Sequence, residues 1–178
     1  MIKMNLQLFA VPGNIILGDG VFSIGATAIA LTRGGGTFAI EREYRAIEAD
    51  GDYGPVKGRI RKTRSVAKLT LNALEILPAN IAKYYPAMEE DTTTTPGTSI
   101  ITATTDIADA DYQATVSWTG KTKAGKQVKI TLENAINLEN IEWNMLDKDE
   151  IVPVITYTAT YLENARETEP WKIEYVTS

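Results

Sequence analysis

Apolar and polar residues alternate with a period of two in several stretches, the pattern of a strand with one buried and one wet face. Over 66–76 (VAKLTLNALEI), leucines and alanine fall on one side and polar residues on the other. Over 151–162, threonines share one face while Ile155, Tyr157 and Ala159 share the other. We therefore expect two two-faced strands. Their polar positions are Lys68, Thr70, Asn72, Thr156, Thr158 and Thr160.

A further pair of expected strands surrounds a run of glycines. The stretches 27–32 and 37–48 flank Arg33-Gly34-Gly35-Gly36, and glycine tolerates the positive φ of a tight reversal. We expect a hairpin with its turn at 33–36. The second strand carries Glu41 and Glu43 on its polar side.

The rest of the chain also favours strands. β-Branched and aromatic residues predict strands over 99–105, 112–119, 127–133 and 171–175, while 134–145 is ambiguous between a strand and a helical turn. The stretch 79–86 (ANIAKYYP) follows Pro78 and closes on Pro86, which predicts about two turns of helix. With strands predominating and no alternating helix rhythm, we expect a mainly β, antiparallel sandwich or barrel with one short flanking α-helix.

The 178 residues fit one domain. We expect an N-terminal arm over 1–20, a long loop over 50–65, a polar loop over 89–98 and a C-terminal arm over 163–178. The start, MIKMNLQLFA, is too interrupted by polar residues for a signal peptide. No run is long and apolar enough to span a bilayer, so we expect no membrane anchor.

The composition excludes most catalytic chemistry. The chain has no cysteine and no histidine, which removes the usual nucleophile–base pairs and the commonest transition-metal ligands. We expect a protein that is not an enzyme, with no catalytic residues, no metal site and no cofactor. The formal net charge of -5 argues against a nucleic-acid binder that works by phosphate neutralisation.

Two short motifs imitate ligand sites. The stretch 120–127 (GKTKAGKQ) is similar to a phosphate loop, but Gln127 replaces the hydroxyl residue and a strand follows, so a hairpin turn is favoured. The stretch 50–64 (DGDYGPVKGRIRKTR) begins like a calcium loop. Gly54, Pro55 and Arg61 occupy positions where that loop needs a carboxylate, a glycine and a glutamate.

The second half of 50–64 is the main basic concentration of an acidic chain. It lacks interleaved aromatics for base stacking. A basic loop on an acidic body can meet the acidic surface of another copy, because complementary charge fixes partner and orientation. Self-association is therefore favoured over nucleic-acid binding.

Several long stretches resemble the major tail tube proteins of long non-contractile-tailed (siphovirus-type) phages and prophages of Gram-positive bacteria. They are LTRGGGTFAIEREYRAIEADGDYGPVKGRIRK, KLTLNALEILPANIAKYYPAM, ENIEWNMLDKDEIVPVITYTATY and EPWKIEY. MNLQLFA is similar to the opening of many phage virion proteins. Together they cover most of the chain, and 92–111 contributes little.

The resemblance implies a β-sandwich subunit of a ring, with a hexamer as the expected assembly. Such rings stack into a hollow tail tube around a tape-measure protein, with tail assembly chaperones as partners, and DNA passes through at ejection. The location implied is the virion, after assembly in the host bacterial cytoplasm. Each subunit gives four strands to an inner barrel, which implies a lumen lined by residues such as Glu41, Glu43, Lys68, Thr70, Asn72, Thr156, Thr158 and Thr160.

The resemblance also gives the loop over 50–65 a role, because the long connection between the first two inner strands reaches the adjacent ring. The candidates for this inter-ring stacking contact are Asp50, Asp52, Tyr53, Lys57, Arg59, Arg61, Lys62 and Arg64. Trp171 is the candidate anchor of the C-terminal arm. Two alternatives stay open: another ring-forming component, such as a tail terminator or an injection-system tube, and a surface- or carbohydrate-binding β-sandwich module.

Overall fold

The computed structural model of the protein describes residues 11–29 and 31–176, so residues 1–10 of the expected N-terminal arm lie outside the described residues. The described chain is mainly antiparallel β-structure with one short α-helix, which confirms the predicted fold class. Its elements are β1 (Ile16–Ile24), β2 (Thr27–Ala28), β3 (Thr32–Ala46), β4 (Ile60–Ala73), α1 (Pro78–Tyr84), β5 (Met88–Asp91), β6 (Ile100–Ala103), β7 (Gln113–Thr122), β8 (Gln127–Asn137), β9 (Val154–Ala159) and β10 (Trp171–Tyr175), with 3-10 turns at Pro12–Asn14, Asp109–Asp111 and Glu163–Ala165.

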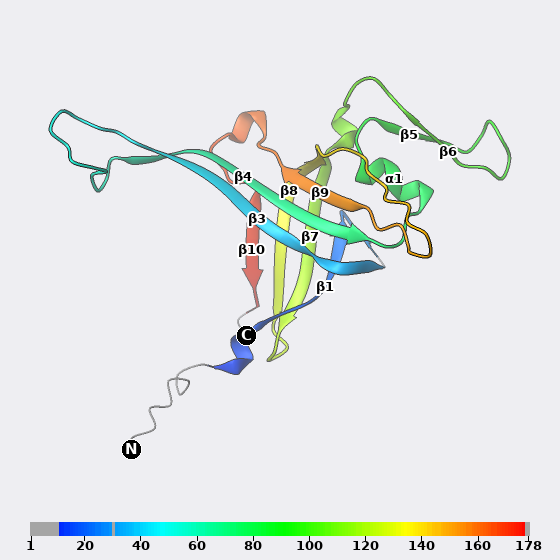
Figure 1. The fold of residues 1–178 in the computed structure, drawn as a ribbon, viewed down its shortest axis with the longest axis horizontal. Coiled ribbons are helices and arrows are strands. Elements are labelled where there is room, and N and C mark those ends of the chain that lie inside the picture. Colours follow the sequence, from blue (N-terminus) through cyan, green and yellow to red (C-terminus); the bar gives the residue numbers. More distant parts are fainter. Residues whose placement is uncertain (1–10, 30, 177–178) are drawn as a thin grey trace, which may run out of the picture.

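One continuous sheet forms both layers of the sandwich. Its strand order is β2-β1-β7-β8-β9-β4-β3, and β10 also pairs with β8. The strand β8 pairs with β10 over 128–132 and with β9 over 135–137, so the sheet divides at β8. In Figure 1, β3 and β4 cross steeply over β10, β8, β7 and β1. This is the orthogonal packing of two sheet layers.

The core lies between the two layers and is built from the inward positions of each strand. Phe22 of β1 and Leu132 of β8 meet Leu69 and Leu71 of β4, and all four are buried. The other buried apolar members of this cluster are Ile24, Ile29, Ala67, Ala73, Tyr84, Tyr85, Val116, Ala135, Ile155, Tyr157 and Ala159. The alternation predicted for β4 and β9 therefore separates the core from a wet face as expected.

The helix α1 closes one end of the core, and the sheet satisfies the carbonyl groups at its end. Tyr157 of β9 donates its hydroxyl to the Lys83 carbonyl at 2.8 Å. Asn137 of β8 donates its side-chain N–H to the Tyr84 carbonyl at 2.8 Å. These bonds satisfy groups that a helix end leaves without internal partners. Burial raises the pKa of Tyr157, so this hydroxyl stays protonated and keeps donating.

The strands β5 and β6 form a separate hairpin beside α1 (Figure 1). Its connection contains the threonine-rich stretch of the expected polar loop. The Asp91 carboxylate accepts a hydrogen bond from the Thr94 hydroxyl, two from the backbone and hydroxyl groups of Thr93 at 2.7 and 2.8 Å, and one from the backbone of Thr94 at 3.1 Å. These bonds hold the pKa of Asp91 well below its usual range and give the polar stretch a defined turn.

The expected hairpin turn at 33–36 is wrong, because Thr32–Ala46 is one strand. Gly34 and Gly35 adopt φ of 83° and 74°, and the pairing of β3 with β4 shifts register between Thr32 and Gly36. The glycines therefore form a bulge, which uses the same left-handed backbone as a turn. Gly36 serves close approach, since a Cβ there would overlap the Thr70 carbonyl oxygen and lie 2.6 Å from the Phe22 ring.

The other local predictions fall close to the observed elements. The helix over 79–86 and the hairpin turn within 120–127 are confirmed. The ambiguous stretch 134–145 continues β8 to Asn137 and is irregular afterwards. The first strand β1 includes residues 16–20, which we assigned to the N-terminal arm, and β4 begins at Ile60, inside the expected loop over 50–65. No helix within the described ranges is long and apolar enough to cross a membrane.

Replacing Gly36 with alanine should destabilise the fold by about 1–3 kcal/mol, because the new methyl group would push against the backbone of β4. Urea denaturation measures the difference. Gly18→Ala is the matched control, since a Cβ at Gly18 of β1 meets nothing within 4 Å. Equal stability of the Gly36→Ala variant and the wild type would contradict the conclusion that Gly36 is required for the close approach of β3 to β4.

Candidate functional site

The strands β3, β4 and β9 present a polar face on the side away from the core. Opposite pairs such as Lys68 with Thr158 and Thr70 with Thr156 share this face, and the two threonine hydroxyls lie 3.0 Å apart. Glu41 and Glu43 of β3 lie opposite Val66 and Arg64 of β4. The pairing therefore brings the predicted lumen residues of three strands onto one surface. They are Glu41, Glu43, Lys68, Thr70, Asn72, Thr156 and Thr158, with Thr160 directly after β9.

The charges of the polar face are locally paired. Glu41 forms an ion pair with Lys68 at 3.1 Å, and Glu43 forms one with Arg64 at 3.0 Å. These pairs are solvent-exposed and contribute little to stability. Their effect on the charge of the surface is larger, because each of these carboxylates is neutralised by a neighbouring cation. The face is polar and close to electrically neutral rather than acidic.

Beyond the body, β3 and β4 continue into a projecting hairpin, which we name the arm and define as residues 44–64. Figure 1 shows it as the long extension on the left. The stacking candidates divide between its parts: Arg61, Lys62 and Arg64 belong to β4, whereas Asp50, Asp52, Tyr53, Lys57 and Arg59 lie in the connection that precedes β4.

The tip of the arm is ordered by its own polar groups. The Asp52 carboxylate accepts a hydrogen bond from the Ala49 N–H at 2.8 Å and forms an ion pair with Arg59, also at 2.8 Å. The Ile47 N–H donates to the Arg59 carbonyl at 2.8 Å, which extends the ladder one step beyond the strands. Asp52 therefore holds the turn. Tyr53 at the tip is fully exposed.

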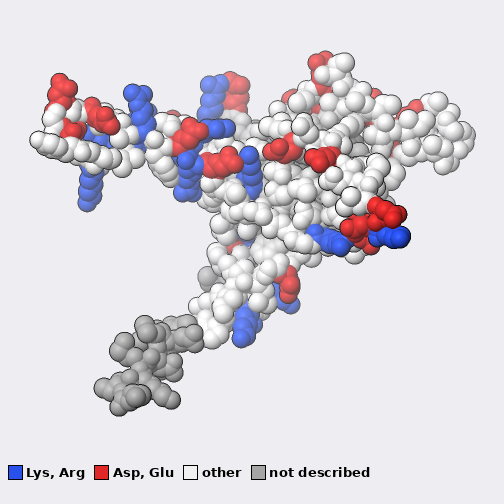
Figure 2. Space-filling model, in the orientation of Figure 1, with Lys and Arg blue, Asp and Glu red and all other residues white. Residues whose placement is uncertain are grey.

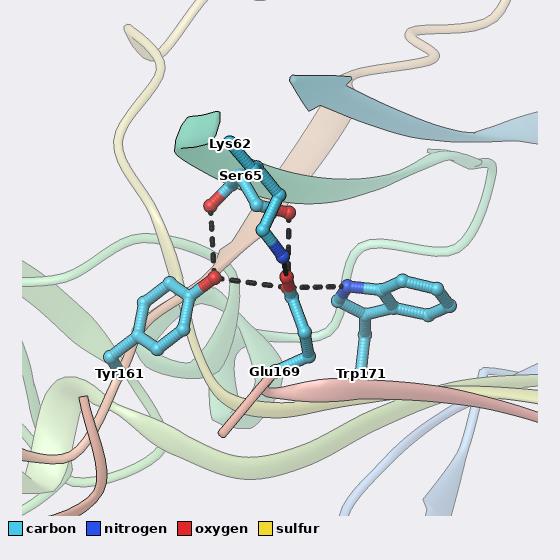
Figure 3. Close-up of polar contacts among 5 residues, drawn as sticks. All are labelled: Lys62, Ser65, Tyr161, Glu169 and Trp171. Carbon is cyan, nitrogen blue, oxygen red and sulfur yellow. Dashed lines mark hydrogen bonds and ion pairs between the residues drawn. The ribbon is translucent and has the colours of Figure 1, made fainter. Parts of the chain in front are cut away.

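A cluster around Glu169 fastens the root of the arm to the body (Figure 3). We name it the clasp and define it as Lys62, Ser65, Tyr161, Glu169 and Trp171. Glu169 Oε2 accepts from the Ser65 hydroxyl at 3.0 Å, the Tyr161 hydroxyl at 3.0 Å and the Trp171 Nε1–H at 2.9 Å. Its Oε1 pairs with the Lys62 ammonium. One carboxylate thus joins β4, the segment after β9 and β10.

The donors around Glu169 favour its charged form. The Lys62 ammonium, followed by the hydrogen bonds from Tyr161, Ser65 and Trp171, lowers the pKa of Glu169 to about 2. The same ion pair raises the pKa of Lys62. The clasp therefore keeps its charges over the whole neutral and mildly acidic range.

Trp171, the predicted anchor of the C-terminal arm, is half-buried at the start of β10. Its ring centroid lies 6.0 Å from that of Phe38, and the Arg42 guanidinium lies 5.9 Å from its centre. Both partners belong to β3. The indole therefore spans from β10 to the layer that carries the arm.

Sequence reasoning missed Glu169, Ser65 and Tyr161. No local motif marks them, because Ser65 and Glu169 are 104 residues apart. The signal that was present is a glutamate directly before Pro170-Trp171, at the start of a predicted strand. A glutamate at this position does not indicate which side chains it contacts.

Comparison with known proteins gives likenesses to solved structures. The sequence matches no protein-family model and no curated protein. The fold is similar to a chain of an extracellular contractile injection system, the PVC sheath-tube complex in its extended state, with a TM-score of 0.48 and 12% sequence identity. The likeness covers 99% of this chain and 100% of that chain.

Replacing Glu169 with glutamine should destabilise the protein at pH 7 by about 1 kcal/mol, since the ion pair is lost while water screens part of its strength. Because folding depresses the pKa of Glu169, its charged carboxylate contributes fully to the free energy of unfolding above pH 4.5, the ordinary pKa of the group. This contribution is lost as the pH falls through about 2, the pKa in the folded protein. Urea denaturation at pH 7 and pH 2 should show the difference between wild type and variant shrinking at the lower pH.

Glu167→Gln is the control for this experiment, because Glu167 is an exposed neighbour outside the clasp. It should leave stability unchanged at both values of pH. A Glu169→Gln penalty that is absent at pH 7, or that persists undiminished at pH 2, would contradict the assigned role of the carboxylate.

Proposed function

We propose that this protein is a structural, non-enzymatic subunit of a tube, the major tail tube protein of a siphovirus-type phage or prophage of a Gram-positive host. Copies associate into rings, with six as the expected number, and the rings stack into a hollow tail tube. The proposal joins the sequence resemblance to the geometry of the β3–β4–β9 layer and the arm.

The observation that carries the proposal is the two-sidedness of this layer combined with its free edge. One face packs into the core and the other is polar. In the described part of the chain, β3 pairs only with β4, which leaves one edge of a 15-residue strand without a ladder partner. An open edge of this length is an aggregation hazard unless it is covered. Pairing with the next copy around a ring covers it and joins the polar faces into a wet lumen.

The polar face suits a conduit for DNA. Its acidic side chains are paired with cations, and its remaining predicted lumen positions are mostly threonine. Such a surface offers no free basic groups in a row to hold phosphates. DNA would pass without specific binding, and a tape-measure protein would occupy the same lumen during assembly, with tail chaperones as further partners. The assembled protein would belong to the virion, after assembly in the host cytoplasm without a membrane anchor.

The arm supplies the contact between rings. It projects well beyond the body, and its tip residues are exposed (Figures 1 and 2). Lys57 and Arg61 have no ion pair among the described residues, so their charge is available to another copy. The clasp keeps the root of the arm in place for this contact.

Electron microscopy of the purified protein over a range of concentrations tests the proposal. We expect rings with a central opening, and stacks or tubes at the highest concentrations. Analytical ultracentrifugation of the same samples should show association that rises with concentration. A protein that stays monomeric throughout, or that forms only closed dimers, would refute the proposed function, and glycan binding by such a monomer would favour a surface-binding module.

A further inference from the structure

We propose that the arm of one copy docks on residues 138–150 of the next copy, which we name the acidic segment. This inference rests on the proposed function, because it identifies the surface that receives the arm between stacked rings. It depends on the charge, the exposed apolar side chains and the placement of the two surfaces.

The acidic segment carries a concentrated negative charge. It holds five carboxylates, Glu139, Glu142, Asp147, Asp149 and Glu150, against the single cation Lys148. The arm has six basic residues, Arg45, Lys57, Arg59, Arg61, Lys62 and Arg64, against three acidic ones. Lys62 and Arg64 are paired with Glu169 and Glu43 outside the arm, and the other four basic residues still outnumber the three acidic ones. Two surfaces of opposite net charge attract and orient each other.

Both surfaces also expose apolar side chains among their charges. Leu138, Ile141, Met145 and Leu146 of the acidic segment are exposed, Met145 to 75%. On the arm, the exposed apolar side chains are Tyr44, Ile47, Tyr53, Val56 and Ile60. A run of exposed apolar residues surrounded by charges is typical of a protein interface. Charge alone would give a weak, salt-sensitive contact, and burial of these groups supplies the remaining free energy.

The acidic segment is held in a fixed shape although it forms no regular structure. Arg33 of β3 pairs with Asp149 at 3.0 Å and with Glu150 at 2.5 Å, which fastens one end. At the other end, the Glu139 N–H donates to the Asn137 side chain at 2.9 Å. Trp143, between them, is half-buried. A surface that is ordered before binding loses less entropy when a partner arrives.

The two surfaces lie on opposite sides of the molecule. In Figure 1 the arm extends to the left, while the acidic segment is the gold trace beside α1 on the right. Figure 2 shows a group of acidic side chains with basic neighbours at that right-hand side, and basic side chains along the arm, whose tip also carries acidic ones. Complementary surfaces that are far apart on one chain cannot satisfy each other within it. Such surfaces join copies head to tail. The resulting stack can grow without closing on itself when the rotation between successive copies does not bring the ends together.

Charge reversal on each surface tests the inference. Lys57→Glu/Arg61→Glu changes the arm without touching the Asp52–Arg59 pair or the clasp, and Glu139→Lys/Glu142→Lys changes the segment without touching the Arg33 pairs. Each double variant should raise the concentration needed for half-maximal assembly about tenfold or more, because like charges then face each other. The fourfold combination should recover most of this loss.

The control is Glu89→Lys/Asp106→Lys, which makes the same change in net charge as the segment variant at exposed positions outside both surfaces. It should assemble at the wild-type concentration. Wild-type assembly by either reversed variant, failure of the combination to improve on its parent variants, or an equal loss in the control would each overturn the inference. Thermal melting confirms that every variant is folded.

Cross-linking separates this inference from the proposed function. The chain has no cysteine, so Tyr53→Cys and Met145→Cys introduce one thiol each. The two variant proteins are mixed with a short bismaleimide, which joins the thiol on the arm of one copy to the thiol on the acidic segment of another. We expect this mixed product to form at least about tenfold faster than the product with a Glu89→Cys partner, because docking raises the effective concentration.

Rings or tubes without this selective product would overturn the inference and leave the proposed function standing. The selective product without rings or tubes would refute the proposed function and support the docking of arm on acidic segment. Absence of both would overturn both.

Discussion

A strand edge can hydrogen-bond to only one neighbour at each position, and in β8 this constraint divides the sheet into two layers. One edge of β8 pairs with β7, while the other edge pairs with β10 along one part of the strand and with β9 along the next. The layer that starts with β9 therefore leaves at an angle and folds back over the rest. The core, the polar face and the direction of the arm all follow from that division. The division falls at the exposed Glu133 and the half-buried Asn134, which lie between the buried Leu132 and Ala135.

The parts of the fold that sequence could predict are those set by local physics. Thr156 and Thr158 alternate with apolar neighbours, so the two faces of β9 were visible before any partner was known. Pro78 marks the start of α1 for the same kind of reason, since its missing N–H costs nothing at the first turn of a helix. Seven of the eight predicted lumen positions share one face, because residues directly opposite each other on paired strands point to the same side of the sheet and every second residue along a strand does so too.

The errors arise where one local signal serves two structures or where the decisive contact is distant. Gly34 and Gly35 supply positive φ, which a hairpin turn and a bulge both need, and only the pairing with β4 distinguishes them. Arg64 was grouped with the loop by its neighbours in sequence, yet its partner is Glu43 across the ladder. Glu169 carries no recognisable pattern, because its role comes from four side chains brought to it by the fold.

The clasp also has a mechanical consequence. The arm is a lever whose fulcrum is the point where Glu169 holds Lys62 and Ser65, and any rotation at a fulcrum is magnified with distance along the lever. A small angular error at the root would move Tyr53 through a much larger arc. In the proposed tube, where the arms join neighbouring rings, the stiffness of this one carboxylate cluster would set how far the tube bends under load, since bending would change the angle between arm and body.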